Sequence, residues 1–362
     1  MTSITLRDVS VDHAHHRAID GLDLTVAAGQ RMALLGPSGS GKTTILRAIA
    51  GLDRVAEGQI LLGERDVTGL RPRDRNIAMI NQEASLQPHL NVERNLAFAL
   101  RLRKVPQPQI DERVSAESRA FSLKELLPRR PRTLSGGERH EVALARSLIR
   151  RSSVLLMDEP FSKIDPVRRG ILLRELVQVQ EGYGVTLLIA TNDQRVALGL
   201  AERIAVIEQG SLVQVGSPHD VYNEPASTFA AGFIGSPPMN LIDGIVTRLD
   251  GRVHVQAGPL SVPTWKASLT SYIGVPVTLG IRPQNVQVDP DPRGTVLRLR
   301  VVGREFLGSE VTVHLTTSSG FHLTATQPHP GPTLDDRVGV TIQPGDIHLY
   351  DTVAGTLITR GI

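Results

Sequence analysis

Cysteine is absent from this chain of 362 residues, and its absence excludes disulfides and thiolate metal sites. This is compatible with a reducing compartment. Long apolar runs are also missing, since none approaches the roughly 18 residues needed to cross a bilayer. Residues 1–8 lack the basic region and apolar core of a signal peptide. We therefore expect any membrane role to be peripheral and to depend on a partner.

A strong excess of either charge is missing as well. The net charge is +3, from 40 basic and 37 acidic residues, and the basic residues form no long run. This balance gives no indication of a nucleic-acid partner. With 40% hydrophobic and 21% charged residues, the composition is that of an ordinary globular protein. The length indicates two or three domains.

The most informative stretch of the sequence is the glycine-rich segment 36–44. It follows the apolar run 32–35, which predicts a buried strand, and precedes residues 45–50, which predict a helix. In this context glycines let backbone N–H groups point at phosphate oxygens beside the positive end of a helix. The P-loop pattern predicts that Lys42 reaches the β- and γ-phosphates and that the Thr43 hydroxyl holds Mg²⁺. The alternative is a chance glycine-rich turn. The candidate nucleotide-binding residues are Gly36, Pro37, Ser38, Gly39, Ser40, Gly41, Lys42, Thr43 and Thr44.

Polar side chains follow two other predicted strands. Asp158 and Glu159 come directly after the apolar run 154–157. Asp158 suits the shell of a Mg²⁺ ion, and Glu159 can polarise an attacking water. Gln82 follows a strand predicted at 77–81, from which its amide would reach Mg²⁺ or the same water. Taken alone, each of these features is an ordinary strand exit, but the P-loop favours the catalytic interpretation of the acid pair.

A second helix start with phosphate-binding character lies at residues 134–138. Ser135, Gly136 and Gly137 precede a strong helical run at 142–148, and such a helix start forms an anion-binding nest. One nucleotide has a single γ-phosphate. A dimer, in which each nucleotide lies between one chain's P-loop and the other chain's Ser-Gly-Gly loop, would use both sites. The simpler alternative is a Ser N-cap followed by turn glycines.

The pattern of predicted elements changes along the chain. Nearly continuous apolar runs at 154–157 and 185–190 predict central parallel strands, joined by a helix over 168–180. Between 92 and 127 the signal is helical with proline interruptions. After about Phe233 helical periodicity disappears.

The C-terminal part of the sequence predicts a small all-β barrel or sandwich. Residues 236–238 indicate a linker, and 245–255 predict a hairpin around an Asp-Gly turn. A second hairpin is predicted from 311–315 and 321–325. Near the N-terminus, alternating segments predict a small antiparallel sheet that flanks the nucleotide.

Taken together, the motifs resemble those of an ABC-transporter nucleotide-binding subunit. The motifs that carry this resemblance, in order, are 36–44, Gln82, 134–138, 156–160 and 162–165. Four further short segments are similar to segments of the carbohydrate-uptake ATPases of the maltose and glycerol-phosphate importer type. These segments are 50–53, 203–206, 214–218 and 231–240. The tail resembles their regulatory β domain, often called TOBE, at 280–286, 305–310 and 344–350. The resemblance covers nearly the whole chain.

This resemblance implies a fold and a domain plan. An α/β P-loop NTPase domain of the ABC type is expected over residues 1–235, with a RecA-like core and an antiparallel β subdomain. Its helical subdomain is expected at about 84–150. A small all-β OB- or TOBE-like regulatory domain is expected over 236–362.

The resemblance also implies an activity and partners. The chain would be the ATPase subunit of an importer for a sugar or a glycerol-phosphate-like solute, with ATP and Mg²⁺ as cofactors. It would lie at the cytoplasmic face of the inner membrane. It would pair with a second ATP-binding subunit, two transmembrane permease subunits and, indirectly, a solute-binding protein. Segment 85–90 resembles the region that docks a permease coupling helix, and Leu86, Pro88 and Leu90 would form a shallow apolar groove there. The alternative for this segment is an ordinary subdomain edge.

Individual roles follow from the same resemblance. Glu159 would position water, Lys42 would stabilise the transferring phosphoryl with Mg²⁺, and Ser135 and Gly137 would contact the γ-phosphate from the other chain. The expected catalytic positions are Glu159, Asn192 and Gln82. The expected Mg²⁺ ligands are Thr43, Gln82 and Asp158. The remaining expected nucleotide contacts are His13, Ser135, Gly136, Gly137, Glu138 and Asp165.

Several positions depart from the family pattern. Asn192 replaces the switch histidine and has a shorter reach and no positive charge. Loss of one preorganised donor typically costs about 3 kcal/mol, or about a hundredfold in rate. His13 lies near the position of the adenine-stacking aromatic residue, and Glu138 replaces the signature glutamine. Glu141 stands where arginine is usual. Lys163 departs from the pattern of its loop.

Two alternative functions follow from these departures and from the P-loop alone. One is a nearly inactive nucleotide-binding partner in a heterodimer. The other is a soluble P-loop kinase or repair ATPase. The second leaves the Ser-Gly-Gly loop and the β tail together unexplained.

Overall fold

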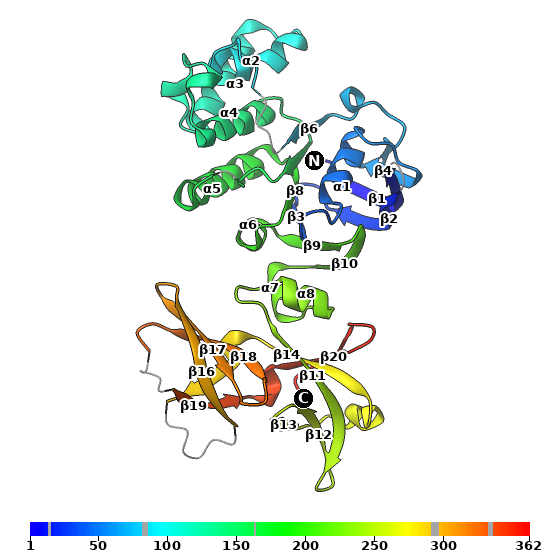
Figure 1. Ribbon diagram of the computed structural model, residues 1–362. Helices are drawn as coiled ribbons and strands as arrows, with labels where there is room; N and C mark the ends of the chain where they lie inside the picture. The colour runs from blue at the N-terminus through cyan, green and yellow to red at the C-terminus, as the bar shows by residue number, and fades with distance from the viewer. Residues whose placement is uncertain (14–15, 82–85, 163, 291–296, 332–335) are drawn as a thin grey trace. The chain divides into compact units, whose positions relative to one another are not determined.

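The computed structural model describes the chain except for residues 14–15, 82–85, 163, 291–296 and 332–335. The chain forms two compact units, Met1–Pro218 and His219–Ile362 (Figure 1).

The first unit is built on a six-stranded sheet in the order β10-β9-β3-β8-β7-β6, parallel from β9 to β6. β10 pairs antiparallel with β9 at the edge. Every residue of β7 and β8 is buried, as expected for parallel strands covered on both faces. This confirms the predicted α/β core. The strands are β3 (Arg31–Leu35), β6 (Ile77–Ile80), β7 (Val154–Asp158), β8 (Thr186–Thr191), β9 (Arg203–Glu208) and β10 (Ser211–Gly216).

A four-stranded antiparallel sheet in the order β2-β1-β4-β5 completes the β structure of this unit. Its apolar face shares one hydrophobic core with helix α1 and strand β3. The sheet is the predicted antiparallel subdomain. Its strands are β1 (Ile4–His13), β2 (His16–Val26), β4 (Glu57–Leu62) and β5 (Arg65–Asp66).

Helix α1 (Lys42–Ala50) connects the P-loop to the core. It ends at Gly51, whose φ of 77° is left-handed and suits glycine. The buried guanidinium of Arg75 lies at this helix end, where backbone carbonyls lack helical partners. It donates hydrogen bonds to the carbonyls of Ala48, Ile49, Thr68 and Leu70. Arg75 therefore fixes the far end of the helix whose start faces the nucleotide site.

The helices α2, α3 and α4 lie together in Figure 1, away from the antiparallel sheet of the same unit. Asn91 caps α2 by accepting from the N–H of Arg94, and the chain breaks before α3 at Pro106, as the sequence predicts. The helices of the unit beyond α1 are α2 (Val92–Leu102), α3 (Gln107–Ala120), α4 (Gly136–Leu148), α5 (Pro166–Tyr183) and α6 (Gln194–Leu200). Short 3₁₀ turns are Pro72–Asp74, Lys124–Leu126 and Pro131–Thr133.

The second unit is mainly antiparallel β structure, which confirms the predicted all-β tail. It has a six-stranded sheet, β13-β12-β11-β14-β20-β21, and a five-stranded sheet, β15-β19-β16-β17-β18. Both contribute to one hydrophobic core. Asp250 and Gly251 have φ of 49° and 79°, which gives the predicted turn between β11 and β12.

The elements of this unit alternate with short helices and 3₁₀ turns. Its strands are β11 (Asn240–Leu249), β12 (Arg252–Ala257), β13 (Leu260–Pro263), β14 (Pro276–Ile281), β15 (Val286–Asp289), β16 (Leu297–Phe306), β17 (Glu310–Thr316), β18 (His322–Pro328), β19 (Arg337–Ile342), β20 (Ile347–Asp351) and β21 (Leu357–Arg360). Its helices are α7 (Pro218–Asn223) and α8 (Thr228–Phe233). Its 3₁₀ turns are Ala267–Tyr272, Pro283–Asn285 and Pro344–Asp346.

The compact units divide at Pro218, and the domain bounds expected from the sequence, 1–235 and 236–362, stay a prediction. Arg282, after β14, is buried. Its guanidinium donates to the carbonyls of Tyr222 and Ile234 and lies 4.3 Å from the centroid of the Tyr222 ring. These contacts fasten α7 and α8 to the β structure that follows them.

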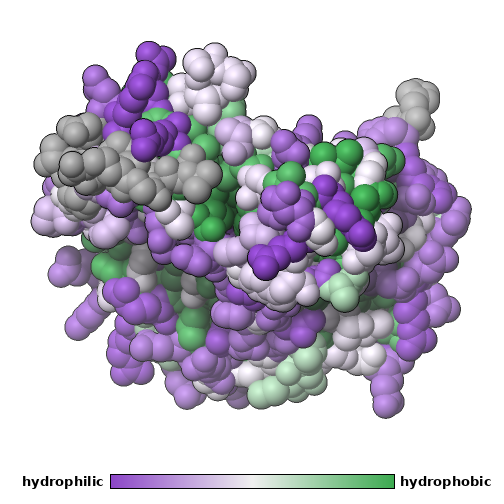
Figure 2. Space-filling model, turned by 90° about the horizontal axis from the view of Figure 1, so that it is seen from below, coloured by the Kyte–Doolittle hydropathy of each residue, from purple (hydrophilic) through white to green (hydrophobic). Residues whose placement is uncertain are grey.

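The surface seen in Figure 2 is mostly hydrophilic, with hydrophobic residues in separate areas. None of the helices in the described parts of the chain combines the length and the apolar character needed to cross a bilayer.

Candidate nucleotide-binding site

A cavity of about 610 Å³ lies in the first unit, over the start of α1. Four segments surround it: the hairpin of β1 and β2, the P-loop with the first turn of α1, the residue after β7, and the turn between β9 and β10. The lining residues are His13, His16, Arg17, Ala18, Ser38, Gly39, Gly41, Lys42, Thr43, Thr44, Glu159, Gln209 and Gly210. Its size is that of a small-molecule site.

The glycines of the P-loop are required by its backbone. A Cβ on Gly36 would lie 2.2 Å from the carbonyl oxygen of Ile207. Gly39 and Gly41 have φ of 82° and 98°, which side chains disfavour. Gly41 is the N-cap of α1 and offers no side-chain cap. The N-terminus of α1 therefore presents its N–H groups and its positive partial charge to the cavity.

Lys42 is folded into the loop. Its Nζ donates to the carbonyl oxygens of Gly36 at 2.9 Å and Pro37 at 2.7 Å. Burial lowers the pKa of Lys42, and the carboxylates of Glu159 and Asp158 act in the opposite direction. An anionic phosphate in the cavity would further stabilise the ammonium form.

Thr43 and Asp158 meet where α1 begins and β7 ends. The Thr43 hydroxyl donates to Oδ1 of Asp158 at 3.0 Å. Burial raises the pKa of Asp158, while the hydrogen bond from Thr43 and the charge of Lys42 lower it. A hydroxyl and a carboxylate are the oxygen ligands that Mg²⁺ prefers, and a cation would offset the burial of the carboxylate. These residues fit a Mg²⁺ ion that takes its remaining ligands from phosphate and water.

Glu159 lines the cavity as the residue that follows β7. Its φ of 43° is left-handed, an uncommon conformation for a residue with a side chain. Its N–H donates to the carbonyl of Ala190 in β8 at 2.9 Å, which fixes the turn. Gln82, the other expected catalytic position on this side, lies outside the described residues.

His13 also lines the site, at the end of β1. Its Nε2 is 3.3 Å from Oγ1 of Thr44 and 3.7 Å from Oδ2 of Asp53. The ring is therefore held at the cavity, where a flat side chain can contact a base. Stacking on adenine stays a prediction.

Two other expected positions lie elsewhere. Asn192 is exposed in the turn after β8 and is not one of the residues that line the cavity. Asp165 is the N-cap of α5, where its carboxylate accepts from the N–H of Arg168 at 3.0 Å. This contact gives Asp165 a structural role within the chain, and its expected contact with nucleotide stays a prediction.

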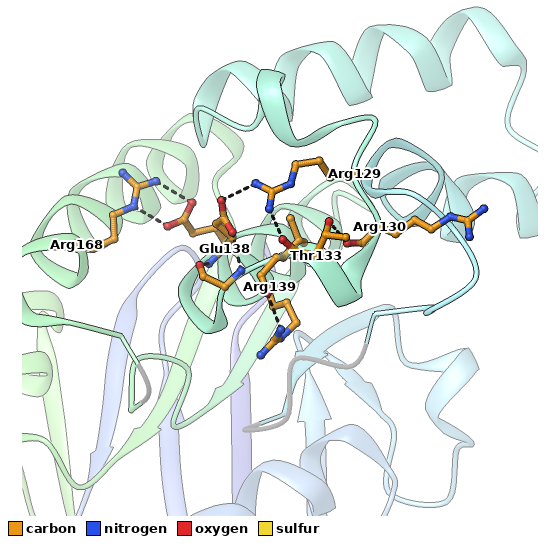
Figure 3. A network of polar contacts seen from close by, with 9 residues as sticks. Arg129, Arg130, Thr133, Glu138, Arg139 and Arg168 are labelled. Carbon is orange, nitrogen blue, oxygen red and sulfur yellow. Dashed lines mark hydrogen bonds and ion pairs between the residues drawn. The ribbon is translucent and has the colours of Figure 1, made fainter.

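The Ser-Gly-Gly loop forms a capping box at the start of α4 (Figure 3). Oγ of Ser135 accepts from the N–H of Glu138 at 3.2 Å, and the Glu138 carboxylate accepts from the N–H of Ser135 at 2.6 Å. Arg129 donates to the same carboxylate at 3.1 Å. The bond from the Ser135 backbone is the main cause that lowers the pKa of Glu138. The N-cap alternative is thus realised, and the Ser135 N–H is occupied by a carboxylate of its own chain.

The P-loop and the Ser-Gly-Gly loop are separate within the chain. The cavity is lined by the P-loop, but residues 135–138 are not part of its lining. The expected contact of Ser135, Gly136 and Gly137 with nucleotide therefore does not occur within one chain and stays a prediction for a dimer.

Some lining residues were not predicted. Gln209 and Gly210 form the turn between β9 and β10, and a Cβ on Gly210 would lie 2.4 Å from the carbonyl oxygen of Ala18. Arg17 also lines the cavity, and its guanidinium pairs with Asp12, Asp20 and Glu57. The tight turn was visible in the sequence as Gln-Gly between two strands, but nothing local indicated that it would face a loop 170 residues earlier in the chain.

A P-loop beside a strand-end carboxylate pair, on a mainly parallel sheet with a flanking antiparallel sheet, defines a P-loop ATPase of the ATP-binding-cassette class. A family model described as ABC transporter matches residues 19–162. Models described as MalK OB fold domain and TOBE domain match residues 235–286 and 279–349. The chain belongs to the family of ABC-transporter ATP-binding proteins that carry these two C-terminal modules.

Relatives align over nearly the whole chain. The trehalose/maltose import ATP-binding protein MalK of Thermococcus litoralis is 41% identical over 99% of this chain and 100% of its own length. The sn-glycerol-3-phosphate import ATP-binding protein UgpC of Yersinia pseudotuberculosis is 38% identical over 94% of both chains. These similarities confirm the resemblance seen in the motifs.

Solved structures show the same fold for the first part of the chain. CbiO1 of Clostridium perfringens, part of the transporter complex cbiONQ, has a TM-score of 0.58 at 24% identity and covers 61% of this chain and 90% of its own. A dimeric ATP-binding cassette bound to ADP and phosphate has a TM-score of 0.54 at 24% identity and covers 59% of this chain and 98% of its own.

Proposed function

We propose that this chain is the ATP-hydrolysing subunit of an ABC importer for a sugar or a glycerol-phosphate-like solute. In this proposal two ATP-binding subunits close on two nucleotides and drive a pair of transmembrane permease subunits at the cytoplasmic face of the membrane. A solute-binding protein delivers the solute. The observation that carries the proposal is the P-loop cavity lined by Lys42, Thr43 and Glu159, with Asp158 hydrogen-bonded to Thr43.

Different residues of the chain have different roles in ATP hydrolysis. N–H groups of the P-loop and the start of α1 bind and orient the phosphates. Thr43 and Asp158 would hold Mg²⁺, which would supply positive charge to the phosphate oxygens. Lys42 adds a second charge. Glu159, fixed by its bond to Ala190, orients the attacking water and accepts its proton.

A second subunit completes the site. Because residues 135–138 lie outside the cavity of their own chain, they are available to close the cavity of another. For the Ser135 N–H to reach a γ-phosphate, the Glu138 carboxylate must leave it. We infer that closure exchanges this internal carboxylate for phosphate.

A cavity of about 260 Å³ between β6 and the helices α2 and α4 supports the permease contact. It is lined by Phe98 and Leu102, and by Arg146 and Arg150. Burial lowers the pKa of both arginines, and Nε of Arg150 is buried with no hydrogen-bond partner among the described residues. This combination suits a permease helix that brings a carboxylate and an apolar side chain into a groove of mixed polar and apolar lining. The predicted groove residues Leu86, Pro88 and Leu90 are not among the lining residues, and Ser85 lies outside the described part.

The test is ATP turnover of the chain copurified with its permease subunits in lipid vesicles. Lys42→Ala and Glu159→Gln are expected to abolish turnover and coupled uptake of solute. Matched controls are Lys124→Ala and Glu112→Gln, which alter exposed side chains of the helical region and should change neither. Normal turnover in the Glu159 variant would contradict the assigned role.

The position of Asn192 favours a second candidate, a catalytically impaired partner in a heterodimer. Its side chain is exposed and outside the cavity lining. Under this candidate the native assembly shows no turnover of its own, and Asn192→His raises turnover by up to about a hundredfold. Turnover by the native homodimer that Glu159→Gln abolishes would exclude it.

A further inference from the structure

Three arginines stand on one face of the five-stranded sheet in the second unit. In β16 the buried residues Leu297 and Leu299 alternate with the exposed residues Arg298 and Arg300. Because side chains alternate between the two faces of a strand, both arginines point away from the core.

The strand register brings a third arginine to the same place. Arg300 pairs directly with Arg337 of β19 and, on its other side, with Thr316 of β17. Arg298 pairs with Gly339, which has no side chain to fill the space. Like charges directly opposite each other across two strands destabilise a sheet. The sheet therefore carries an unfavourable charge arrangement that a bound anion would relieve.

These arginines line a cavity of about 530 Å³ together with Leu299, Thr316, Thr317 and Ser318. None of the described lining residues is acidic. No ion pair between the three guanidiniums and a carboxylate occurs within the described residues. Carboxylates of that face include Asp289 on β15, beyond Gly339, which has a contact of its own. Glu305 on β16 lies on the same face and is 3.1 Å from Nε2 of His314. Neither carboxylate lines the cavity.

We propose that this cavity, here called the arginine cavity, binds a small phosphate-bearing anion. Guanidinium groups bind phosphate oxygens bidentately with charge-assisted hydrogen bonds, and the hydroxyl of Ser318 adds a neutral donor at the rim. The lining is a single cluster of seven residues, which suits a small molecule better than an extended nucleic-acid backbone. The site is distinct from the P-loop and would give the C-terminal unit a ligand of its own.

Titration of inorganic phosphate into the full chain, with the P-loop saturated by a non-hydrolysable ATP analogue and Mg²⁺, tests the proposal. We expect saturable binding that weakens at least tenfold in the double variant Arg300→Gln/Arg337→Gln. Arg252→Gln removes an exposed arginine from β12 of the same unit and should leave phosphate affinity unchanged. Equal affinity for the ATP analogue in all three proteins shows that each is folded.

A second measurement, thermal unfolding, tests the charge repulsion between Arg300 and Arg337. In phosphate-free buffer the double variant should unfold at a temperature equal to or above that of the native chain, and phosphate should raise the midpoint of the native chain only. Glucose 6-phosphate as a second probe separates the sources: binding by both probes indicates a phosphomonoester, and binding by phosphate alone indicates the free ion. Equal phosphate binding by native and double variant, or binding of an oligonucleotide but of neither small anion, overturns the proposal.

Discussion

Arg168 in α5 holds the buried carboxylate of Glu141 in α4 with two hydrogen bonds, Nε to Oε1 at 2.6 Å and Nη2 to Oε2 at 2.8 Å (Figure 3). This bidentate pair ties the helix that starts at the Ser-Gly-Gly loop to the helix that starts at Asp165. It also accounts for an acidic residue where the family usually has arginine, because the basic partner is supplied from α5.

Removal of the arginine should therefore destabilise the first unit. Arg168→Met leaves the Glu141 carboxylate buried without its cation, at a cost of about 3 kcal/mol in the free energy of unfolding. Denaturant unfolding of Arg168→Met, Glu141→Met and the double variant gives the measurement, and the double variant should recover much of the loss. Arg174→Met, at an exposed position of α5, should stay within about 0.5 kcal/mol of the native chain. Additive losses in the double variant would show that the two residues are not coupled.

The cap that Arg75 forms at the end of α1 should stabilise the first unit about as much as the Arg168–Glu141 pair does. Arg75→Met removes the donor for four carbonyls around the end of α1, and each buried unsatisfied group costs about 1–3 kcal/mol. Some of these carbonyls will find water, so we expect a net loss of about 3 kcal/mol in unfolding free energy. Arg73→Met, whose side chain is 75% exposed, is the matched control. An unchanged midpoint for Arg75→Met would mean that the helix end does not need this cap.

Substitution of Glu138 tests the internal carboxylate at the start of α4. Glu138→Gln keeps a side-chain oxygen for the capping box but removes the negative charge that occupies the Ser135 N–H. Because that charge must leave before a phosphate can bind, the variant should hydrolyse ATP faster in the assembled transporter, by about tenfold. Turnover in vesicles is the measurement. A lower rate in the glutamine variant would indicate that the charge assists closure.

Glu117 should make stability depend on pH. Its carboxyl is buried and accepts from the Tyr183 hydroxyl at 2.7 Å, and burial raises its pKa above 4.5. Because the pKa of this carboxyl is higher in the folded chain than in the unfolded chain, it does not lower the free energy of unfolding at a pH below the unfolded pKa. Above that pH its contribution lowers the free energy of unfolding increasingly, until the carboxyl of the folded chain also ionises. Burial raises the pKa of Tyr183 to about 12, so this hydroxyl remains a donor throughout.

Glu117→Gln removes that penalty while keeping the acceptor. The unfolding free energy of the variant should exceed that of the native chain by an amount that increases from pH 4 to pH 7. Urea unfolding across this range measures it, with Glu112→Gln on the exposed side of α3 as control. A difference that is constant with pH would contradict the assignment.

Much of the fold could be predicted from local pattern. Fully apolar runs such as 154–157 indicate strands buried on both faces, and the Asp250-Gly251 turn has one favoured geometry. The P-loop could be identified from the sequence because its phosphate-binding residues lie within nine consecutive positions.

Long-range pairing could not be predicted in the same way. The turn at Gly210 packs against the carbonyl oxygen of Ala18, and Arg168 donates to Glu141. No local sequence pattern indicates either contact. The Glu138 carboxylate is expected near a partner's nucleotide, which stays a prediction. Within its own chain it accepts from the Ser135 N–H and from Arg129, and the sequence did not indicate the contact with Arg129. The arginine cavity depends on strand register, which places Arg300 opposite Arg337.

In the proposed dimer, ATP lies between the P-loop of one chain and the Ser-Gly-Gly loop of another. Because the chain has no cysteine, Ser38→Cys and Gly136→Cys can be introduced into separate copies, each with Glu159→Gln to block hydrolysis. A Cβ at Gly136 meets no atom within 4 Å, and Gly182→Cys, equally open and distant on α5, replaces it in the control mixture. With a short thiol-reactive cross-linker, we expect a dimer linked between positions 38 and 136 that forms with ATP and Mg²⁺, fails to form with ADP, and is absent from the control mixture. Equal cross-linking with and without ATP, or none with it, would show that ATP does not join the two chains in this way.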